Sequence, residues 1–239
     1  MKAMIFAAGM GKRLGKITAT RPKALVEING RSILRIAVEK VASHGFADII
    51  INVHHFADMV EDEINLLVKA GFRISVSDER DQLLETGGGL YKAKCFFDDE
   101  PFLLYNSDVI SDIDLGGLYR FHKQNSALAT LAVAERNDTR AFLIDSTGLV
   151  SGWLNRKTGE RIISRVENEP FTEIAFSGIH VADPGIFNYM HEGVYSLTAL
   201  YLDLARSHRI CTYRHDSDFW ADIGTPGDLT AVRLRFGTR

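Results

Sequence analysis

The sequence has few cysteines, no excess of basic residues and no long apolar run, and each absence excludes a class of protein. Cys95 and Cys211 are the only cysteines among 239 residues. They match no metal-ligand spacing, and two thiols are too few for a disulfide scaffold. The net charge of −3 argues against nucleic acid as the main partner. Since no apolar stretch approaches the ~18–20 residues that cross a bilayer, we expect no membrane partner.

The overall composition is ordinary for a globular protein, with 46% apolar and 25% charged residues. The amino terminus opens as a strand and lacks the basic segment and apolar core of a signal peptide, so we expect a cytoplasmic location. The length suits one large domain or two small ones. Because no linker-like or repeated segment interrupts the chain, we predict one domain over residues 1–239.

Strand-like and helix-like runs alternate through the first half of the chain. This alternation predicts an α/β fold, a Rossmann-like three-layer αβα sandwich with a mixed, mostly parallel central sheet and functional loops at the carboxyl ends of its strands. Apolar periodicity places strands at 3–7, 47–53, 73–77, 101–105, 128–134, 141–144, 148–155, 161–166, 173–181 and 210–214. The same patterns place helices at 33–43, 57–70, 90–94, 196–206 and 228–236.

A glycine turn that carries cations follows the first strand. Gly9 and Gly11 lack Cβ atoms, so the backbone can approach a ligand closely and direct N–H groups at phosphate oxygens. Arg13 and Lys23 add positive charge to the same region. Leu14 stands where the Rossmann loop has its third glycine, and the P-loop pattern is absent. The turn therefore suits a polyphosphate, and the alternative is an ordinary structural turn.

The longer string from Ala7 to Leu25 resembles the amino-terminal signature of sugar-1-phosphate nucleotidyltransferases, A-A-G-x-G-x-R-L-x-P-x-T-x-x-x-P-K-x-L. The chain departs from it at Lys16, where the family usually has proline, which affects the rigidity of the loop more than its chemistry. The resemblance implies a nucleotidyltransferase fold of the GT-A-like type. The matching residues are Ala7, Ala8, Gly9, Gly11, Arg13, Leu14, Thr18, Pro22, Lys23 and Leu25.

Two carboxylates in separate loops suggest a metal site. Asp108 follows the buried strand at 101–105, within Asn106-Ser107-Asp108, and Asp222 lies in Trp220-Ala221-Asp222. Two such groups together with phosphate oxygens suit Mg²⁺, which prefers hard oxygen ligands. In the family that the chain resembles, N-G-D and W-x-D-x-G-T segments bear the metal, and Ser107 replaces the usual glycine. The alternative is that both aspartates cap turns or helices.

A third signature lies in Leu84-Glu85-Thr86-Gly87-Gly88-Gly89-Leu90. We expect the glycines to form a turn before a helix at 90–94 and to permit close backbone approach to a ligand. The corresponding segment of the family lies against the nucleobase, which implies nucleotide binding by Glu85, Gly87 and Gly88, beside Ala8, Gly9, Gly11 and Asn106. The form L-E-T-G-G-G resembles the N-acetylmuramate-1-phosphate uridylyltransferases most and favours UTP.

The residues that bind the sugar are harder to predict, because the chain lacks the E-K-P segment that many members of the family carry. The nearest counterpart is 161–170, where Arg165 could supply the missing cation. Ser177 and Gly178 lie in an F-S-G-I string that resembles the turn facing the sugar, where they could bind hydroxyl or N-acetyl groups. A strand residue beside a bulge glycine is the equal alternative.

The resemblance implies transfer of a nucleoside monophosphate from UTP to a sugar 1-phosphate, possibly N-acetylmuramate 1-phosphate, with Mg²⁺ as the cofactor. It assigns Arg13 to the leaving pyrophosphate and Lys23 to the α-phosphate and the attacking phosphate. The nucleotide-binding half would span about 1–125 and the sugar-phosphate half about 126–239. Alternatives are guanylyl transfer to mannose or heptose 1-phosphate, cytidylyl transfer to choline phosphate, or a catalytically silent sensor. The oligomeric state, monomer or homodimer, stays open.

Overall fold

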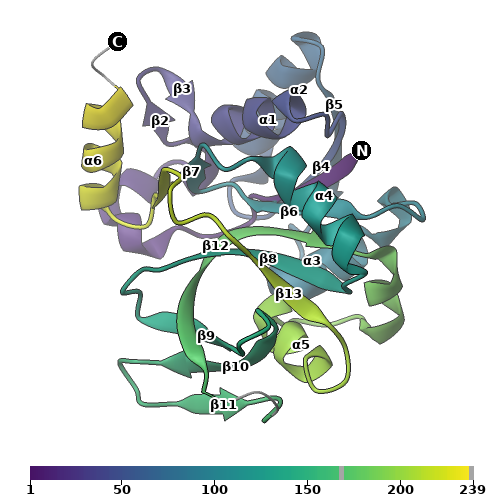
Figure 1. Ribbon diagram of the computed structural model, residues 1–239. Helices are drawn as coiled ribbons and strands as arrows, with labels where there is room; N and C mark the ends of the chain where they lie inside the picture. The colour runs from purple at the N-terminus through teal and green to yellow at the C-terminus, as the bar shows by residue number, and fades with distance from the viewer. Residues whose placement is uncertain (167–169, 237–239) are drawn as a thin grey trace.

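A mixed β-sheet runs through the computed structural model, which describes residues 1–166 and 170–236. Its strand order is β11-β10-β9-β12-β6-β1-β4-β5, with β8 beside β12 and β13 beside β8 (Figure 1). The strands of this sheet are β1 Lys2–Phe6, β4 Asp48–Val53, β5 Arg73–Asp78, β6 Phe102–Asn106, β8 Ala129–Ala134, β9 Arg140–Ile144, β10 Val150–Asn155, β11 Arg161–Ile163, β12 Thr172–Ala182 and β13 Ile210–Arg214.

Most neighbours in the central part of the sheet are parallel. The pairs β6-β1, β1-β4, β4-β5 and β8-β13 are parallel, whereas β12 is antiparallel to β6 and to β8. At its other end β12 also pairs with β9, and β9, β10 and β11 continue as an antiparallel extension. The prediction of a mixed, mostly parallel central sheet is confirmed.

Helices cover both faces of the sheet, which gives the predicted three layers. Side chains from α1, α2 and α4 form one apolar cluster on one face, and α3 and α5 contribute to a second cluster on the other. The helices are α1 Ile33–Ser43, α2 Ala57–Lys69, α3 Glu85–Lys92, α4 Leu115–Asn125, α5 Leu197–Leu204 and α6 Pro226–Phe236, with 3-10 turns η1 Lys12–Thr18, η2 Lys23–Leu25, η3 Lys94–Phe96 and η4 Pro184–Tyr189.

Local signals explain the well-predicted helices. In α1, residues spaced three and four apart are buried, and the Ser32 side chain accepts a hydrogen bond from the backbone N–H of Arg35 at the helix start. Ser196 caps α5 in the same way through Ala199, as predicted. Helix α4 was not predicted because Gly116 and Gly117 interrupt its pattern.

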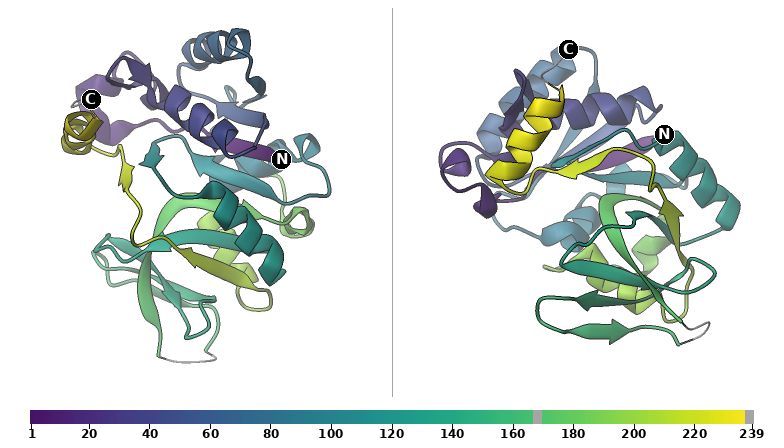
Figure 2. Two further views of the ribbon diagram at one scale, coloured as in Figure 1. Left: turned by 45° about the horizontal axis from the view of Figure 1, so that its top comes forward. Right: turned by 60° about the vertical axis from the view of Figure 1, so that its left-hand side comes forward.

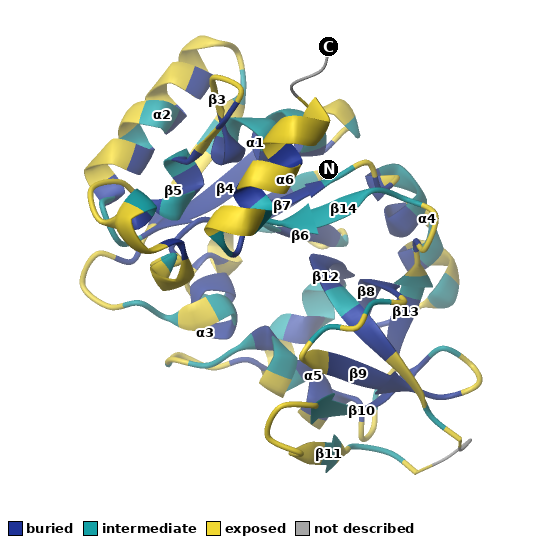
Figure 3. Cartoon of the chain, turned by 90° about the vertical axis from the view of Figure 1, so that its left-hand side faces the viewer, coloured by how far each residue is buried: buried dark blue, intermediate teal, exposed yellow. Residues whose placement is uncertain are grey.

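Short strands and the last helix complete one end of the molecule (Figures 2 and 3). Strand β14 (Trp220–Asp222) pairs antiparallel with β7 (Val109–Ser111), and β2 (Glu27–Ile28) pairs with β3 (Arg31–Ser32). Apolar side chains of α6 pack with those of η1 and β2 in a third cluster. This packing places α6 against η1, the segment that follows β1.

Two buried histidines make the stability of this fold sensitive to acid. Burial lowers the pKa of His180 to about 3, and burial, partly opposed by Asp183, lowers the pKa of His122 to about 4. Both are neutral in the fold, whereas the unfolded pKa is ~6.5. The unfolded chain therefore binds more protons below that pH, and the free energy of unfolding falls by ~1.4 kcal/mol per pH unit for each histidine until its folded pKa is reached.

Urea unfolding at pH 7 and pH 5 tests this prediction. The free energy of unfolding should fall by ~2 kcal/mol for each of the two histidines. His122→Asn keeps an acceptor or donor for Thr130, whose hydroxyl is 3.0 Å from His122 Nδ1, and should remove that histidine's share. The exposed His191→Asn is the matched control. Equal pH slopes for wild type and His122→Asn would contradict the assignment.

Candidate functional site

The four charged residues singled out in the sequence converge at the carboxyl end of β1 and β6. Lys23 lies on η2, and Asp108 follows β6. Because β14 pairs with β7, the end of β14 that carries Asp222 lies beside Val109. The backbone N–H of Ile223 donates to the carbonyl of Asp108 at 2.9 Å. Hydrogen bonding between two distant segments thus brings both carboxylates to one place.

Each carboxylate faces one of the two predicted cations. Lys23 Nζ forms an ion pair with Oδ2 of Asp108, and Arg13 Nη2 lies 3.9 Å from Oδ2 of Asp222. The Lys23 side chain is only 11% exposed, whereas that of Arg13 is 69% exposed. A shielded cation acts more strongly on nearby charge than a solvated one. Lys23 is therefore the fixed positive charge of the site, and Arg13 can follow a ligand.

The two carboxylates also influence each other. Burial raises the pKa of Asp222, and the negative charge of Asp108 raises it further, against the opposing charges of Lys23 and Arg13. Two carboxylates that repel each other in this way favour a divalent cation between them. Within residues 1–166 and 170–236, no three His, Cys, Asp or Glu side chains gather as a metal-binding group. The pair fits an ion whose other ligands come from phosphate and water.

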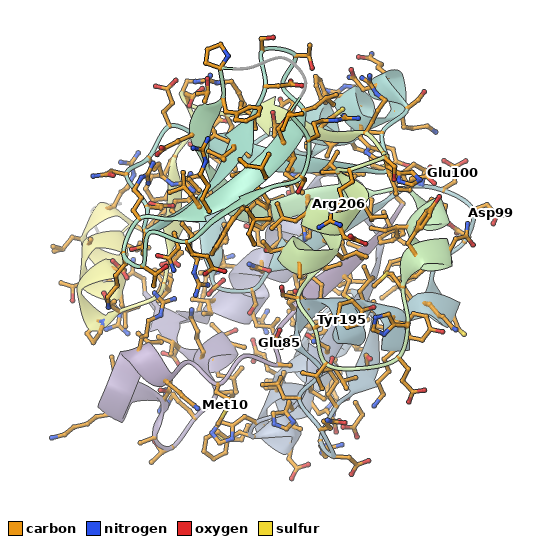
Figure 4. The ribbon with its side chains drawn as sticks, turned by 90° about the horizontal axis from the view of Figure 1, so that it is seen from below. Met10, Glu85, Asp99, Glu100, Tyr195 and Arg206 are labelled. Atoms are coloured by element: carbon orange, nitrogen blue, oxygen red, sulfur yellow. The ribbon has the colours of Figure 1, made fainter. Side chains whose placement is uncertain are left out.

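The two glycines of the first loop serve different purposes. A Cβ atom on Gly9 would meet nothing within 4 Å, so the backbone there faces open space. Gly11 has φ +61°, and its Cβ would lie 2.8 Å from Cβ of Lys23. Gly11 therefore allows the loop to pack against Lys23, whereas Gly9 leaves room for a ligand. Met10, between them, is exposed at the loop (Figure 4).

The predicted glycine turn before a helix at 90–94 is wrong. The three glycines lie inside α3, which begins at Glu85, and all three are buried. A Cβ on Gly87 would lie 2.4 Å from the Tyr195 ring, one on Gly88 would lie 1.9 Å from the carbonyl oxygen of Gly193, and one on Gly89 would lie 2.6 Å from Glu79 Oε1. The glycines let α3 pack against the 193–195 segment and the buried carboxylate of Glu79, since no side chain fits there. Figure 4 labels Tyr195 and, at the start of α3, Glu85.

Gly88→Ala should lower the free energy of unfolding by about 2–3 kcal/mol, because its new methyl group overlaps a backbone atom. Gly9→Ala is the matched control, since open space surrounds that position, and its stability should equal that of wild type. Urea unfolding measures both. Equal stability of the two variants would show that the 193–195 segment yields easily and that packing does not require the glycine.

A buried polar chain that the sequence analysis missed links the end of β1 to the start of α3. The backbone N–H of Ala7 donates to Asn52 Oδ1 at 2.7 Å, and Asn52 Nδ2 donates to Glu79 Oε1 at 2.8 Å. Leu84 N–H donates to Glu79 Oε2 at 3.1 Å. Burial raises the pKa of Glu79, although its hydrogen bonds oppose this. The only sign of this buried chain in the sequence was Asn52, a polar residue near the end of the apolar strand at 47–53.

Ser177 and Gly178, which the sequence predicts as sugar-binding residues, lie in β12. Ser177 is fully buried, its Oγ accepts from Nη1 of Arg136 at 2.9 Å, and it lies 2.6 Å from Nε2 of His215. Gly178 has φ +71°, and a Cβ there would lie 2.8 Å from Nδ2 of Asn106. The sequence did not single out Arg136 or His215. The Ser177 hydroxyl thus holds protein groups, while Gly178 allows β12 to approach the end of β6.

Arg165 lies just beyond β11, where its backbone N–H donates to the carbonyl of Ser151 at 3.2 Å. It is not among the residues that line the large cleft described below. Within the 161–170 segment compared with E-K-P, residues 167–169 lie outside the described residues.

A cleft of ≈ 1650 Å³ opens beside Arg13 and Asp222. It is lined on one side by β14 and α6 and on the other by the antiparallel extension of the sheet, and Figure 3 shows these elements on opposite sides of the molecule. Its far wall is largely apolar and aromatic, and its rim carries Arg140 and Lys157. In the described part of the chain, neither of these two side chains makes a hydrogen bond or an ion pair. The apolar wall residues are Ala141, Phe142, Trp153, Ile162, Phe176, Ala199 and Leu202.

Comparisons with known proteins identify the family of the chain. The family model for "Nucleotidyl transferase" matches residues 2–237. The N-acetylmuramate alpha-1-phosphate uridylyltransferase of Caulobacter vibrioides is 31% identical over 98% of this chain and 96% of its own length. A UTP–glucose-1-phosphate uridylyltransferase of Synechocystis is 30% identical over 98% of this chain, which spans 63% of that relative.

Solved structures share the fold at lower identity. UDP-glucose pyrophosphorylase from Acinetobacter baumanii superposes with a TM-score of 0.80 at 17% identity, over 99% of this chain and 93% of that one. HddC from Yersinia pseudotuberculosis gives 0.76 at 21% identity, over 98% and 99%. No helix among residues 1–166 and 170–236 has the length and apolar character needed to span a membrane. The family match over nearly the whole chain, on a Rossmann-like fold, shows that this chain belongs to the nucleotidyl transferase family and is a sugar-1-phosphate nucleotidyltransferase.

Proposed function

We propose that this chain transfers a nucleoside monophosphate from UTP to N-acetylmuramate 1-phosphate or a closely similar sugar 1-phosphate, and releases pyrophosphate. The observation that carries the transfer is the convergence of Arg13, Lys23, Asp108 and Asp222 beside an open glycine loop. A catalytically silent sensor would not need this set of charges together.

The reaction is a displacement at phosphorus. An oxygen of the sugar 1-phosphate attacks the α-phosphorus, the bond from that phosphorus to the bridging oxygen breaks, and pyrophosphate leaves with the electron pair. The attacking phosphate is already an anion, so no base has to activate it. The protein must align two mutually repelling anions and stabilise the charge that develops.

The residues divide this work by position. Lys23, shielded from water, would lie between the α-phosphate and the attacking phosphate, where its charge counts most. Arg13, largely exposed, would follow the pyrophosphate as it leaves. Asp108 and Asp222 would hold Mg²⁺, which when bound supplies positive charge to the reacting phosphates. Gly9 and Gly11 would offer backbone N–H groups, and Ala8 would lie beside them.

The nucleobase of the bound nucleotide would lie between the glycine loop and the start of α3. Glu85 has φ +58° and opens that helix, so the backbone groups of Glu85 and Thr86 lie at the helix end, whereas the N–H groups of Gly87 and Gly88 donate to the carbonyl of Tyr195. Gly87, Gly88 and Asn106 remain predicted nucleotide contacts, with the two buried glycines acting through the shape of α3. UTP is proposed because two relatives matched over most of both chains are uridylyltransferases.

The cleft supports a sugar with both apolar and acidic substituents. Its aromatic wall suits acyl and ether groups, which bury apolar surface, better than bare hydroxyls. Arg140 and Lys157 at the rim have no protein partner among the described side chains, and they suit a carboxylate. Gly178 would border the sugar, whereas a sugar contact by the fully buried Ser177 stays a prediction. A sugar-phosphate contact by Arg165 stays a prediction.

We also propose a cytoplasmic location, where nucleoside triphosphates are available. The proposed division into a nucleotide half (about 1–125) and a sugar-phosphate half (about 126–239) within one domain rests on the parallel block β6-β1-β4-β5 and the antiparallel extension that borders the cleft.

A substrate matrix tests the proposal. Pyrophosphate release with Mg²⁺ would be measured for UTP, GTP, CTP and dTTP against N-acetylmuramate, glucose and mannose 1-phosphates and choline phosphate. The highest kcat/KM is expected for UTP with N-acetylmuramate 1-phosphate. Arg140→Ala should raise the KM for that sugar and leave the KM for glucose 1-phosphate unchanged. A preference for GTP with mannose 1-phosphate, or for CTP with choline phosphate, would replace the proposed substrates.

A further inference from the structure

Arg136 occupies an unusual position behind the carboxylate pair. It lies in the loop after β8, and its guanidinium carbon is 3.8 Å from the centroid of the Trp220 ring. Trp220 begins β14, and Asp222 ends the same strand. Trp220 and Asp222 line the cleft, whereas Arg136 is not among its lining residues. Arg136 can therefore act on the site through the indole and through its charge, which interacts with Asp222.

The guanidinium is held from several directions. Nη1 donates to Ser177 Oγ at 2.9 Å, and Nη2 donates to the carbonyl of Phe176 at 2.9 Å. Nε and Nη2 both reach Asp138 Oδ2 at 3.3 Å. Only 19% of the side chain is exposed, and burial lowers its pKa while Asp138 opposes this. A planar fork with this many partners has one orientation, which a lysine ammonium cannot reproduce.

The indole is fixed by the same part of β12, where its pairing with β8 shifts register between Phe176 and His180. Trp220 Nε1 donates to the carbonyl oxygen of Ser177 at 2.8 Å. One face of the ring contacts the guanidinium, and its N–H end is bonded to the residue that also accepts from Arg136. Stacking of a guanidinium on an indole contributes about 0.5–2 kcal/mol. Arg136 and Ser177 together therefore define both the plane and the rotation of the Trp220 ring.

The strand that carries Asp222 needs such an anchor. β14 has three residues and, among residues 1–166 and 170–236, pairs with the three-residue β7 alone, in a sheet of two strands. An isolated two-stranded ribbon of this kind is marginal in water. Trp220 secures one end of β14, and Asp222 lies at the other, opposite Val109. The position of the Asp222 carboxylate relative to Asp108 depends on how this short strand is held.

We propose that Arg136 is a positioning residue that orients Trp220 and thereby sets Asp222 for divalent metal binding. The part of this inference that concerns metal binding rests on the proposed function, whereas the part that concerns the orientation of Trp220 does not. The contacts predict that loss of the fork frees the indole and weakens metal binding without unfolding the protein. Partners that orient metal ligands indirectly typically contribute ~10–100-fold in metal affinity.

The test uses Trp153→Phe as the background, because Trp153 and Trp220 are the only tryptophans. Arg136→Lys keeps the charge and removes the fork. The exposed Arg206→Lys is the matched control. Two quantities are measured on each protein, namely quenching of Trp220 fluorescence by acrylamide and the Kd of Mn²⁺, used as a probe ion and followed by the electron paramagnetic resonance of free Mn²⁺. Circular dichroism and thermal unfolding check the fold.

Arg136→Lys should increase the quenching of Trp220 and raise the Kd of Mn²⁺ by ~10-fold, while Arg206→Lys changes neither. If Arg136→Lys fails to fold, Trp220→Phe, which keeps a ring but loses the bond to Ser177, should still weaken Mn²⁺ binding. Unchanged quenching, or increased quenching with an unchanged Kd, overturns the proposal, as does a wild type that binds no Mn²⁺. Absence of nucleotidyl transfer with every substrate, together with the expected quenching and Kd changes, would defeat the proposed function and leave this inference standing.

Discussion

Lys23→Ala should lower kcat by at least ~10²-fold, the usual effect of removing one group that stabilises transition-state charge. Lys23 is the most shielded cation of the site and pairs with Asp108, so water cannot replace its charge after mutation. Because the interaction strengthens as the phosphorus is attacked, KM for the nucleotide should change much less than kcat. Steady-state kinetics at saturating Mg²⁺ measure both constants.

Lys16→Ala is the matched control for Lys23→Ala. Lys16 lies in η1, before Lys23 in the chain, is exposed, and has no side-chain partner among the described residues. Its removal should leave kcat near the wild-type value. A Lys23→Ala enzyme with near-native kcat, or an equal loss in both variants, would contradict the role of Lys23 as the fixed charge between the two phosphates.

Asp108→Asn should abolish metal-dependent turnover while the protein stays folded. The substitution keeps the shape of the side chain and removes the negative charge, leaving Asp222 as the only carboxylate for the ion. It also removes the ion-pair partner of Lys23, so the Lys23 ammonium group is held less firmly in its position. Turnover as a function of Mg²⁺ concentration, with circular dichroism on the same sample, measures the effect.

The exposed Asp99→Asn controls for the general loss of one negative charge and should behave as wild type. Wild-type activity of Asp108→Asn with an unchanged Mg²⁺ dependence would remove Asp108 from the metal site. The same experiment distinguishes a metal ligand from a purely structural aspartate. Loss of a structural aspartate would lower thermal stability, but the protein that remains folded would show an unchanged Mg²⁺ dependence of turnover.

Elements with strong local signals could be predicted from the sequence. Helix α1 and strand β13 begin and end where the apolar periodicity placed them, and Ser196 caps α5 as expected. Such elements carry their pattern and their caps in contiguous residues, so no distant contact is needed to recognise them. The glycine loop and Asp108 were recognisable as short strings after predicted strands, and Asp222 was recognisable through the family's W-x-D-x-G-T string.

Elements decided by tertiary contacts could not be predicted. Glycine has a low helix propensity, yet Gly87, Gly88 and Gly89 are helical because the 193–195 segment and Glu79 leave no space for a side chain. The same holds for Gly117 in α4, where a Cβ would lie 2.6 Å from Asp114. Packing outweighed propensity in both helices, and the sequence does not show which neighbours will meet there.

The residues that organise the site were equally hidden. Glu79 and Arg136 act through partners that lie 27 and 41 positions away, Asn52 and Ser177. A buried carboxylate or guanidinium looks like any surface charge in a sequence until its partners are known. The sequence therefore predicts the groups at the ends of the strands, whereas the groups that hold them in place require the structure.

The most direct test of this account follows the α-phosphorus itself. The protein, Mg²⁺, UTP labelled at the α-phosphorus and N-acetylmuramate 1-phosphate are incubated, and the labelled products are separated. The account predicts that the label appears in a nucleotide sugar, in equal amount to the pyrophosphate released, and that none forms without the sugar 1-phosphate. Label found only in free UMP, or unchanged UTP with every sugar 1-phosphate offered, would contradict it.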